Sequence, residues 1–529
     1  MKTTKKLLAM ALAAAMVVTA FAGCSGNNDT SSADSTSSAS SEASTSSDAS
    51  TSDESSATED DGTIHPMRIV QPGTLCPDYE TGMAAVNEKL KEDGVNIEVS
   101  VTRIPWDAYA EKLNLMLTTG EEFELLHVMQ DVKNLSAIAG MGAISSIHDS
   151  IQNYPDLYNK FSETEWLGTL YKGEEYAVPC YWRSFDNTMS YMDYRSDIAE
   201  KVGYDEFPDT TEGIIDLMKK SQDEILNETG MKAYSWFHQV QDTAHWLHRS
   251  YDTYPFYVEN SLGICLIRQD GTVDSFYESE EFKKDANTYY EMYQAGLIDP
   301  DILNRDHQKQ YDDANYGAML PSQTFDPYTG VTMQKNGVEG AEVKWVEAFG
   351  DDIPDMIYTY VQNLNAISST SEDPESGLKF LNWLYASEEN HDLFHYGIEG
   401  THYTKTGDHR IEQVKGDDGN PLYSMDTWMT GYLPYMAYAT DTPDEQVDYM
   451  TYKSDNYVIS PAAGFIFDSS NVTSELTNLQ TEIISSIYPI KVGMVSYEDN
   501  IDAAIEKLKA AGLDKYMDCL LYTSDAADE

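Results

Sequence analysis

Between Met67 and Met129, short apolar segments alternate with amphipathic ones. Three of these segments have the apolar, β-branched composition of strands, and two carry apolar side chains at helical spacing. In chain order they are 67–71, 79–91, 95–101, 106–119 and 123–129. Strands and helices that alternate with short connections predict a parallel sheet covered by helices on both faces. The sequence therefore predicts an α/β fold.

The size of the chain predicts how many lobes it forms, and its charge excludes one class of partner. A single hydrophobic core stops growing at roughly 250–300 residues, so a chain of 529 residues is expected to form two lobes. The formal net charge is −56, whereas proteins that bind DNA or RNA present a basic surface. We therefore expect an exposed acidic protein that binds no nucleic acid.

The N-terminal region resembles a bacterial lipoprotein signal. Lys2, Lys5 and Lys6 precede an apolar run over 7–21, which is too short for a comfortable membrane span. The run ends in Phe-Ala-Gly-Cys, so residues 1–23 are predicted to be a lipoprotein signal peptide. Cys24 would carry acyl chains such as palmitate and anchor the protein at the extracellular face of the cell membrane. The alternative is an ordinary cleaved signal with an incidental cysteine.

Two further segments are set apart from the folded body. Residues 24–62 are predicted to be a disordered tether, because from Ser25 onward they contain no Lys, Arg, aromatic or large aliphatic residue. Residues 519–529 (CLLYTSDAADE) match the translation of a transposase sequencing adapter, so we expect them to be an artefact that follows Asp518.

The cysteines and histidines give no sign of a metal or cofactor site. No C-x-x-C pair is present, so neither a structural metal nor a disulfide framework is expected. Bridges between Cys76 and Cys180, or between Cys180 and Cys265, remain open. The pairs His245–His248 and His391–His395 have helical spacing, but two histidines without a third ligand favour core or solvated side chains over a metal site.

Five segments resemble a known family. The runs WDAYAEKLNLMLTTGEEFELL (106–126), EEYAVPCYW (174–182) and YRSDIAEKVGYDEFPDTTEGI (194–214) are similar to family 1 extracellular solute-binding proteins of ABC importers. Residues 366–403, with their Gly-Ile-Glu-Gly-Thr-His-Tyr stretch, and the tail over 464–515 resemble the LipO-type lipoprotein branch of that family.

The resemblance implies a periplasmic-binding-protein type II (Venus flytrap) fold with discontinuous lobes. On this basis the first lobe would comprise 63–180 and 361–420, and the second 181–360 and 421–518. The resemblance also implies a monomer that captures a small ligand, with a carbohydrate expected, and delivers it to ABC permease and ATPase subunits.

Aromatic and polar residues that follow predicted strands are the candidates for ligand contact. Aromatic rings cover the C–H faces of sugars, and carboxylates, amides and arginines bind the hydroxyls. The candidates lie after the strand that crosses between the lobes, on a Gly-flanked loop, on a later aromatic segment and at a helix start. They are Tyr181, Trp182, Arg183 and Asp186; Glu399, His402 and Tyr403; Trp428 and Tyr432; and Trp106 and Asp107.

Each candidate also has a structural interpretation, and other functions stay open. Trp182 could pack the hinge, Trp106 could staple its helix to the core, and Glu399 could satisfy backbone amides of its loop. An oligopeptide is the alternative ligand. A secreted glycoside hydrolase or a surface adhesin is the alternative class, although the chain has no H-E-x-x-H, G-x-S-x-G or Gly-rich phosphate loop.

Overall fold

The computed structural model describes residues 62–527. Short gaps in this description fall at 131, 183–190, 236–243, 260–261, 306, 324–328, 351, 418, 452–454 and 464–468. The predictions for Cys24, the tether, Arg183 and Asp186 lie outside the described residues. None of the helices described is long and apolar enough to cross a membrane.

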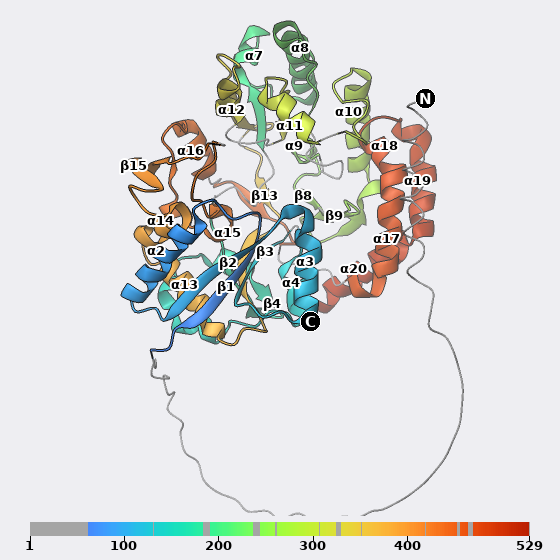
Figure 1. Cartoon of the computed structure of the whole chain (residues 1–529). Helices are drawn as coiled ribbons and strands as arrows, with labels where there is room; N and C mark the ends of the chain where they lie inside the picture. The colour runs from blue at the N-terminus through green and yellow to red at the C-terminus, as the bar shows by residue number, and fades with distance from the viewer. Residues whose placement is uncertain are drawn as a thin grey trace, which may run out of the picture. The chain divides into compact units, whose positions relative to one another are not determined.

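A five-stranded sheet forms the centre of the first lobe (Figure 1). Its strand order is β2-β1-β3-β14-β6, and β14 runs antiparallel to both of its neighbours. The strands are β1 (His65–Pro72), β2 (Ile97–Ile104), β3 (Leu125–Met129), β6 (Ala177–Pro179) and β14 (Asn363–Ile367). The predicted α/β architecture is therefore confirmed, with one antiparallel strand added from far along the chain.

Both faces of this sheet are covered by apolar side chains, as the sequence predicts. Neighbouring residues of β1 point to opposite faces: Ile69 belongs to one core with α2 (Tyr79–Glu92) and α13 (Pro374–Leu384), and Val70 belongs to another with α3 (Trp106–Thr119). The short elements around them are α4 (Leu135–Gly140), η1 (Ser150–Asn153), α5 (Pro155–Tyr158), α6 (Glu163–Leu167), β4 (Leu170–Tyr171), β5 (Glu174–Glu175) and α14 (Glu388–Tyr396).

The second lobe has its own core. Its strands are β7 (Tyr191–Arg195), β8 (Phe256–Val258), β9 (Cys265–Arg268), β10 (Val273–Ser275), β11 (Ser322–Gln323), β12 (Val343–Glu347) and β13 (Asp355–Ile357). Its helices are α7 (Ser196–Lys201), α8 (Thr211–Thr229), α9 (His245–His248), η2 (Phe276–Glu278), α10 (Glu280–Gln294), α11 (His307–Asn315) and α12 (Thr329–Lys335). Buried residues of β7, α8, β9 and α10 belong to one apolar cluster.

The C-terminal helices pack against this second core. Buried Leu479, Leu508 and Leu520 belong to the same cluster as Met192 of β7. The elements are η4 (Ser469–Val472), α17 (Thr473–Glu482), the π-helical turn η5 (Ile483–Ile487), α18 (Tyr488–Lys491), α19 (Tyr497–Ala511) and α20 (Leu513–Ala527), with α20 continuing across Asp518. The chain thus leaves the first sheet after β6, returns at β14 and leaves again before α17.

The structure corrects one predicted boundary, which placed the start of the second lobe's last segment at residue 421. Tyr423 and Met425 are buried in the first lobe's core. The ring of Tyr423 lies so close to α2 that a Cβ at Gly82 would come within 2.1 Å of it. The elements from here to the C-terminal helices are β15 (Tyr403–Gly407), β16 (Arg410–Gln413), α15 (Thr427–Thr430), η3 (Leu433–Tyr435), β17 (Tyr438–Ala439), α16 (Asp444–Thr451) and β18 (Tyr457–Ile459).

Candidate functional site

The carboxyl ends of the parallel strands meet at one edge of the first sheet. Strands β1, β2, β3 and β6 all end there, and antiparallel β14 begins there at Asn363. Ligands of open α/β sheets bind outside this edge. The predicted residues Trp106 and Asp107 follow β2, and Tyr181 and Trp182 follow β6. The topology therefore brings two separately predicted groups to the same edge.

Two tryptophans from distant parts of the chain stack at this edge. The ring centroids of Trp106 and Trp428 are 5.9 Å apart, with 23° between their planes. Trp106 is 55% exposed, and Asp107 beside it is exposed as well. We call the stacked Trp106 and Trp428 the indole shelf. It offers a flat apolar surface, which suits the C–H face of a sugar ring, and the exposed Asp107 follows Trp106 in the sequence.

A row of buried polar side chains lies in the sheet beneath α15. Asn365 of β14 pairs with His127 of β3, and Gln71 of β1 pairs with Arg103 of β2. All four side chains are buried, and the His127 and Trp428 rings are T-shaped to each other, with centroids 5.1 Å apart. Burial lowers the pKa of His127 to about 3, so its ring is neutral at pH 7.

This row fixes the turn that carries Trp428. The Asn365 side-chain amide donates to the Met429 carbonyl at 3.0 Å, and Arg103 Nη1 is 2.8 Å from Asp426 Oδ2. The sequence prediction missed these residues. A signal was present, because single polar residues interrupt apolar strands in LLHVM and NLNAI, and a buried polar residue is more informative than an exposed apolar one.

Tyr181 and Tyr432, predicted in different clusters, lie side by side. Their backbones form a parallel bridge, and the Leu433 amide donates to the Tyr181 carbonyl at 2.6 Å. Lys160 Nζ lies 5.4 Å from the centre of the Tyr432 ring. Trp182 is half-buried and packs near Tyr191 and Met436, between the first sheet and β7.

The Gly-flanked loop is built differently. Glu399 is exposed, whereas His402 and Tyr403 are buried. His402 stacks on Tyr423 with centroids 5.2 Å apart, and its Nδ1 accepts from the Ile398 amide at 2.9 Å. These contacts tie the loop to Tyr423, whose ring lies against α2 at Gly82. The ligand-contact role of all these residues remains a prediction.

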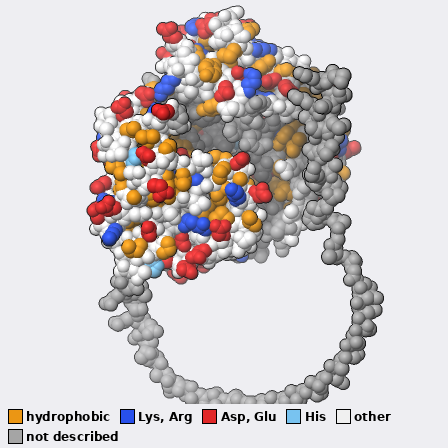
Figure 2. Space-filling model, in the orientation of Figure 1, with side chains coloured by type: hydrophobic (Ala, Val, Ile, Leu, Met, Phe, Trp, Pro, Cys, Tyr) orange, Lys and Arg blue, Asp and Glu red, His pale blue; other side chains and the backbone are white. Residues whose placement is uncertain are grey.

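The described residues hold no candidate metal centre, and their cysteines form no disulfide. No three His, Cys, Asp or Glu side chains among them are grouped closely enough to bind a metal ion. Cys76, Cys180 and Cys265 are present as thiols, so neither of the two bridges left open by the sequence is formed. On the face drawn in Figure 2, acidic side chains are spread widely among fewer basic ones, in keeping with the negative charge of the chain.

Comparisons with known proteins identify the family. Residues 77–391 match the model described as "Bacterial extracellular solute-binding protein", and residues 461–518 match a domain of unknown function, DUF3502. A carbohydrate ABC transporter substrate-binding protein of Streptococcus pneumoniae is 23% identical over 450 residues, covering 82% of this chain and 85% of that protein.

Two solved structures share the fold. The N-glycan transport solute-binding protein of Streptococcus pneumoniae aligns with a TM-score of 0.69 at 19% identity, covering 87% of this chain and 98% of that one. A solute-binding protein of Bifidobacterium longum infantis, described as binding HMO, aligns with a TM-score of 0.62 at 16% identity, covering 88% and 99%. The two-lobe α/β prediction agrees with both, and a binding protein is favoured over a glycoside hydrolase. Because the first family model spans more than half of its residues, the chain belongs to the bacterial extracellular solute-binding protein family.

Proposed function

We propose that this chain is a lipid-anchored receptor that captures an oligosaccharide outside the cytoplasm and delivers it to an ABC permease. The observation that carries the proposal is the indole shelf, in which the exposed Trp106 is followed by the exposed Asp107 at the carboxyl edge of the first sheet. Relatives named for carbohydrate, N-glycan and HMO binding support a sugar as the ligand.

The shelf fits a sugar because its apolar and polar parts are adjacent. The C–H face of a pyranose would cover Trp106, while Asp107 would accept from hydroxyls at the ring's rim. Tyr181, Trp182 and Tyr432 would contact further rings of the same oligosaccharide. Residues of the second lobe would close over the ligand by a hinge motion, because contacts made only in the closed state favour that state.

The anchor and the partners complete the proposal. Acylated Cys24 would hold the protein at the extracellular face of the membrane, with residues 25–62 as the tether. A monomer would then present its bound sugar to the permease, whose ATPase subunits drive import. An oligopeptide is the second candidate ligand, because an exposed aromatic shelf suits peptide side chains as well.

A thermal-shift screen of the mature protein tests the ligand class. Candidates would be N-glycan, milk-type, fructan and glucan oligosaccharides, with oligopeptides and polyamines as the competing classes. A ligand present at 100 times its Kd stabilises the folded state by about 2.7 kcal/mol, which raises the melting temperature measurably. Stabilisation by peptides and by no glycan would contradict the sugar assignment, and a chemically altered ligand after incubation would contradict the receptor assignment.

A further inference from the structure

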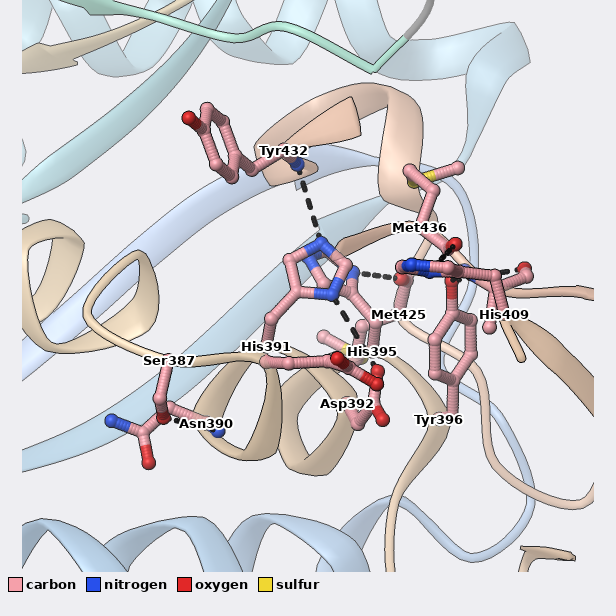
Figure 3. A network of polar contacts seen from close by, with 12 residues as sticks. Ser387, Asn390, His391, Asp392, His395, Tyr396, His409, Met425, Tyr432 and Met436 are labelled. Atoms are coloured by element: carbon pink, nitrogen blue, oxygen red, sulfur yellow. Dashed lines mark hydrogen bonds and ion pairs between the residues drawn. The ribbon is translucent and has the colours of Figure 1, made fainter. Parts of the chain in front are cut away.

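The turn that carries Trp428 is held from behind by a buried histidine. Helix α15 has only four residues, Thr427–Thr430, and so short a helix is not stable by itself. His395 of α14 lies behind it. Its Nδ1 is 2.6 Å from the Met425 carbonyl oxygen (Figure 3). Its Nε2 is 3.2 Å from the Thr430 carbonyl oxygen. The buried ring thus faces carbonyl oxygens on both sides of Trp428 and, with one N–H, donates to one of them.

A second histidine on the same face of α14 holds the next part of the segment. His391 lies one turn before His395, with 4.4 Å between the ring centroids. Its Nε2 accepts from the Tyr432 amide at 3.2 Å. Tyr396 continues the series, because its hydroxyl donates to the Ala437 carbonyl at 3.2 Å and accepts from the Ala437 amide at 3.0 Å. Side chains of α14 therefore bind the backbone at several points from Met425 to Ala437.

The protonation states of the two rings follow from their surroundings. Burial lowers the pKa of both His391 and His395 to about 3, so each ring is neutral and carries one N–H at pH 7. In His395 the shorter contact marks Nδ1 as the donor to Met425. In His391, Nε2 accepts, so the proton is on Nδ1, which faces Asp392 Oδ1 at 3.8 Å. Asp392 in turn pairs with Lys405 Nζ at 2.8 Å.

We propose that His391 and His395 are positioning residues for the ligand site, which set the orientation of Trp428 and Tyr432 through the backbone without touching the ligand. The inference rests on the proposed function, in which the indole shelf receives the sugar. The two histidines act through different ring nitrogens, Nδ1 at 395 and Nε2 at 391, and this difference makes the role testable.

Asparagine and glutamine separate the two nitrogens. The side-chain nitrogen of asparagine is bonded to Cγ, as Nδ1 of histidine is, whereas the terminal atoms of glutamine reach as far as Nε2. His395→Asn keeps the donor to Met425 and His395→Gln removes it. His391→Gln keeps an acceptor for Tyr432 and His391→Asn removes it. The conservative replacement is therefore asparagine at position 395 and glutamine at position 391.

The experiment measures ligand affinity, melting temperature and the circular dichroism of the coupled Trp106–Trp428 pair in all four variants. We expect His395→Asn and His391→Gln to bind the ligand with affinities within about threefold of wild type. We expect His395→Gln and His391→Asn to bind about tenfold more weakly and to show an altered indole signal, because each loses one buried hydrogen bond. The inference would be overturned if the loss of affinity in each variant matched its loss of melting temperature. It would also be overturned if the asparagine and glutamine variants at one position bound the ligand equally well.

Trp428→Ala separates failure of this inference from failure of the proposed function. If Trp428→Ala binds ligand as wild type does, the shelf is not the ligand site, and the positioning role falls with it. If Trp428→Ala weakens binding but the affinities of the four histidine variants do not depend on which ring nitrogen is replaced, the site stands and the histidines are only structural. Both results are distinguishable in the same titrations.

Discussion

Replacing Trp106 by alanine tests the indole shelf most directly. A tryptophan side chain contributes up to about 250 Å², so an exposure of 55% leaves roughly 140 Å² in contact with solvent. A sugar ring lying on one face would cover about half of this area. At about 25 cal/mol per Å², the contact contributes roughly 1.7 kcal/mol. Trp106→Ala is therefore expected to weaken binding about 20-fold.

The measurement is a calorimetric titration of wild type and variant with the best ligand from the screen. Leu115→Ala is the matched control, because Leu115 lies on the same helix α3, is 61% exposed and is about 14 Å further along the helix axis. Both variants should unfold within a few degrees of wild type, since neither side chain fills the core. An affinity loss below twofold in Trp106→Ala, or an equal loss in Leu115→Ala, would refute the assignment of the shelf.

Three further predictions concern other parts of the chain. Trp182→Ala should weaken ligand binding at least tenfold with a small loss of stability, and unchanged affinity in the same titration would remove Trp182 from the site. Cys24→Ala should move the protein from the membrane fraction to the medium, and retention in the membrane fraction would reject the anchor. The folded-state pKa of His127 is about 3 and its unfolded value about 6.5. Above pH 6.5 the ring is neutral in both the folded and the unfolded state, and its contribution to stability is fully present. Below pH 6.5 the unfolded state binds a proton that the folded state does not, so the free energy of unfolding falls by about 1.4 kcal/mol per pH unit. His127→Gln should reduce that slope in urea unfolding between pH 7.5 and 5, and an unchanged slope would contradict a neutral buried ring.

The first half of the first lobe could be predicted because its signals are local. Apolar alternation over 67–129 became β1, α2, β2, α3 and β3, with ends within a few residues of those expected. The ends of two helices also follow from local residues. Gly120 closes α3 in the left-handed conformation, with φ at 66°, and Asp373 caps α13, with Pro374 at its first position. These features depend on neighbouring residues alone, so a single sequence contains them.

The site could be predicted only in its parts. Trp106 and Trp428 were each candidates, yet nothing in their spacing places one ring on the other, because their contact depends on β14 entering the sheet and on α15 crossing its edge. The boundary at residue 421 was wrong for the same reason, since Tyr423 fills a space that Gly82 leaves open on α2. His391 and His395 were expected to be core or solvated side chains, and both are buried, but their backbone partners cannot be predicted without the fold.

Several buried polar side chains of the first lobe lie where the site needs them. A polar group in an apolar core costs stability unless its hydrogen bonds are made, and proteins depart from an all-apolar core mainly where function requires it. Here Arg103 and Asn365 hold α15 from the sheet, and His395 and His391 hold it from α14. A four-residue turn fixed from two sides keeps Trp428 in one orientation before any ligand arrives. A preformed shelf loses less side-chain entropy on binding. The first lobe would therefore select the ligand, and closure of the second lobe would increase the affinity for the selected ligand.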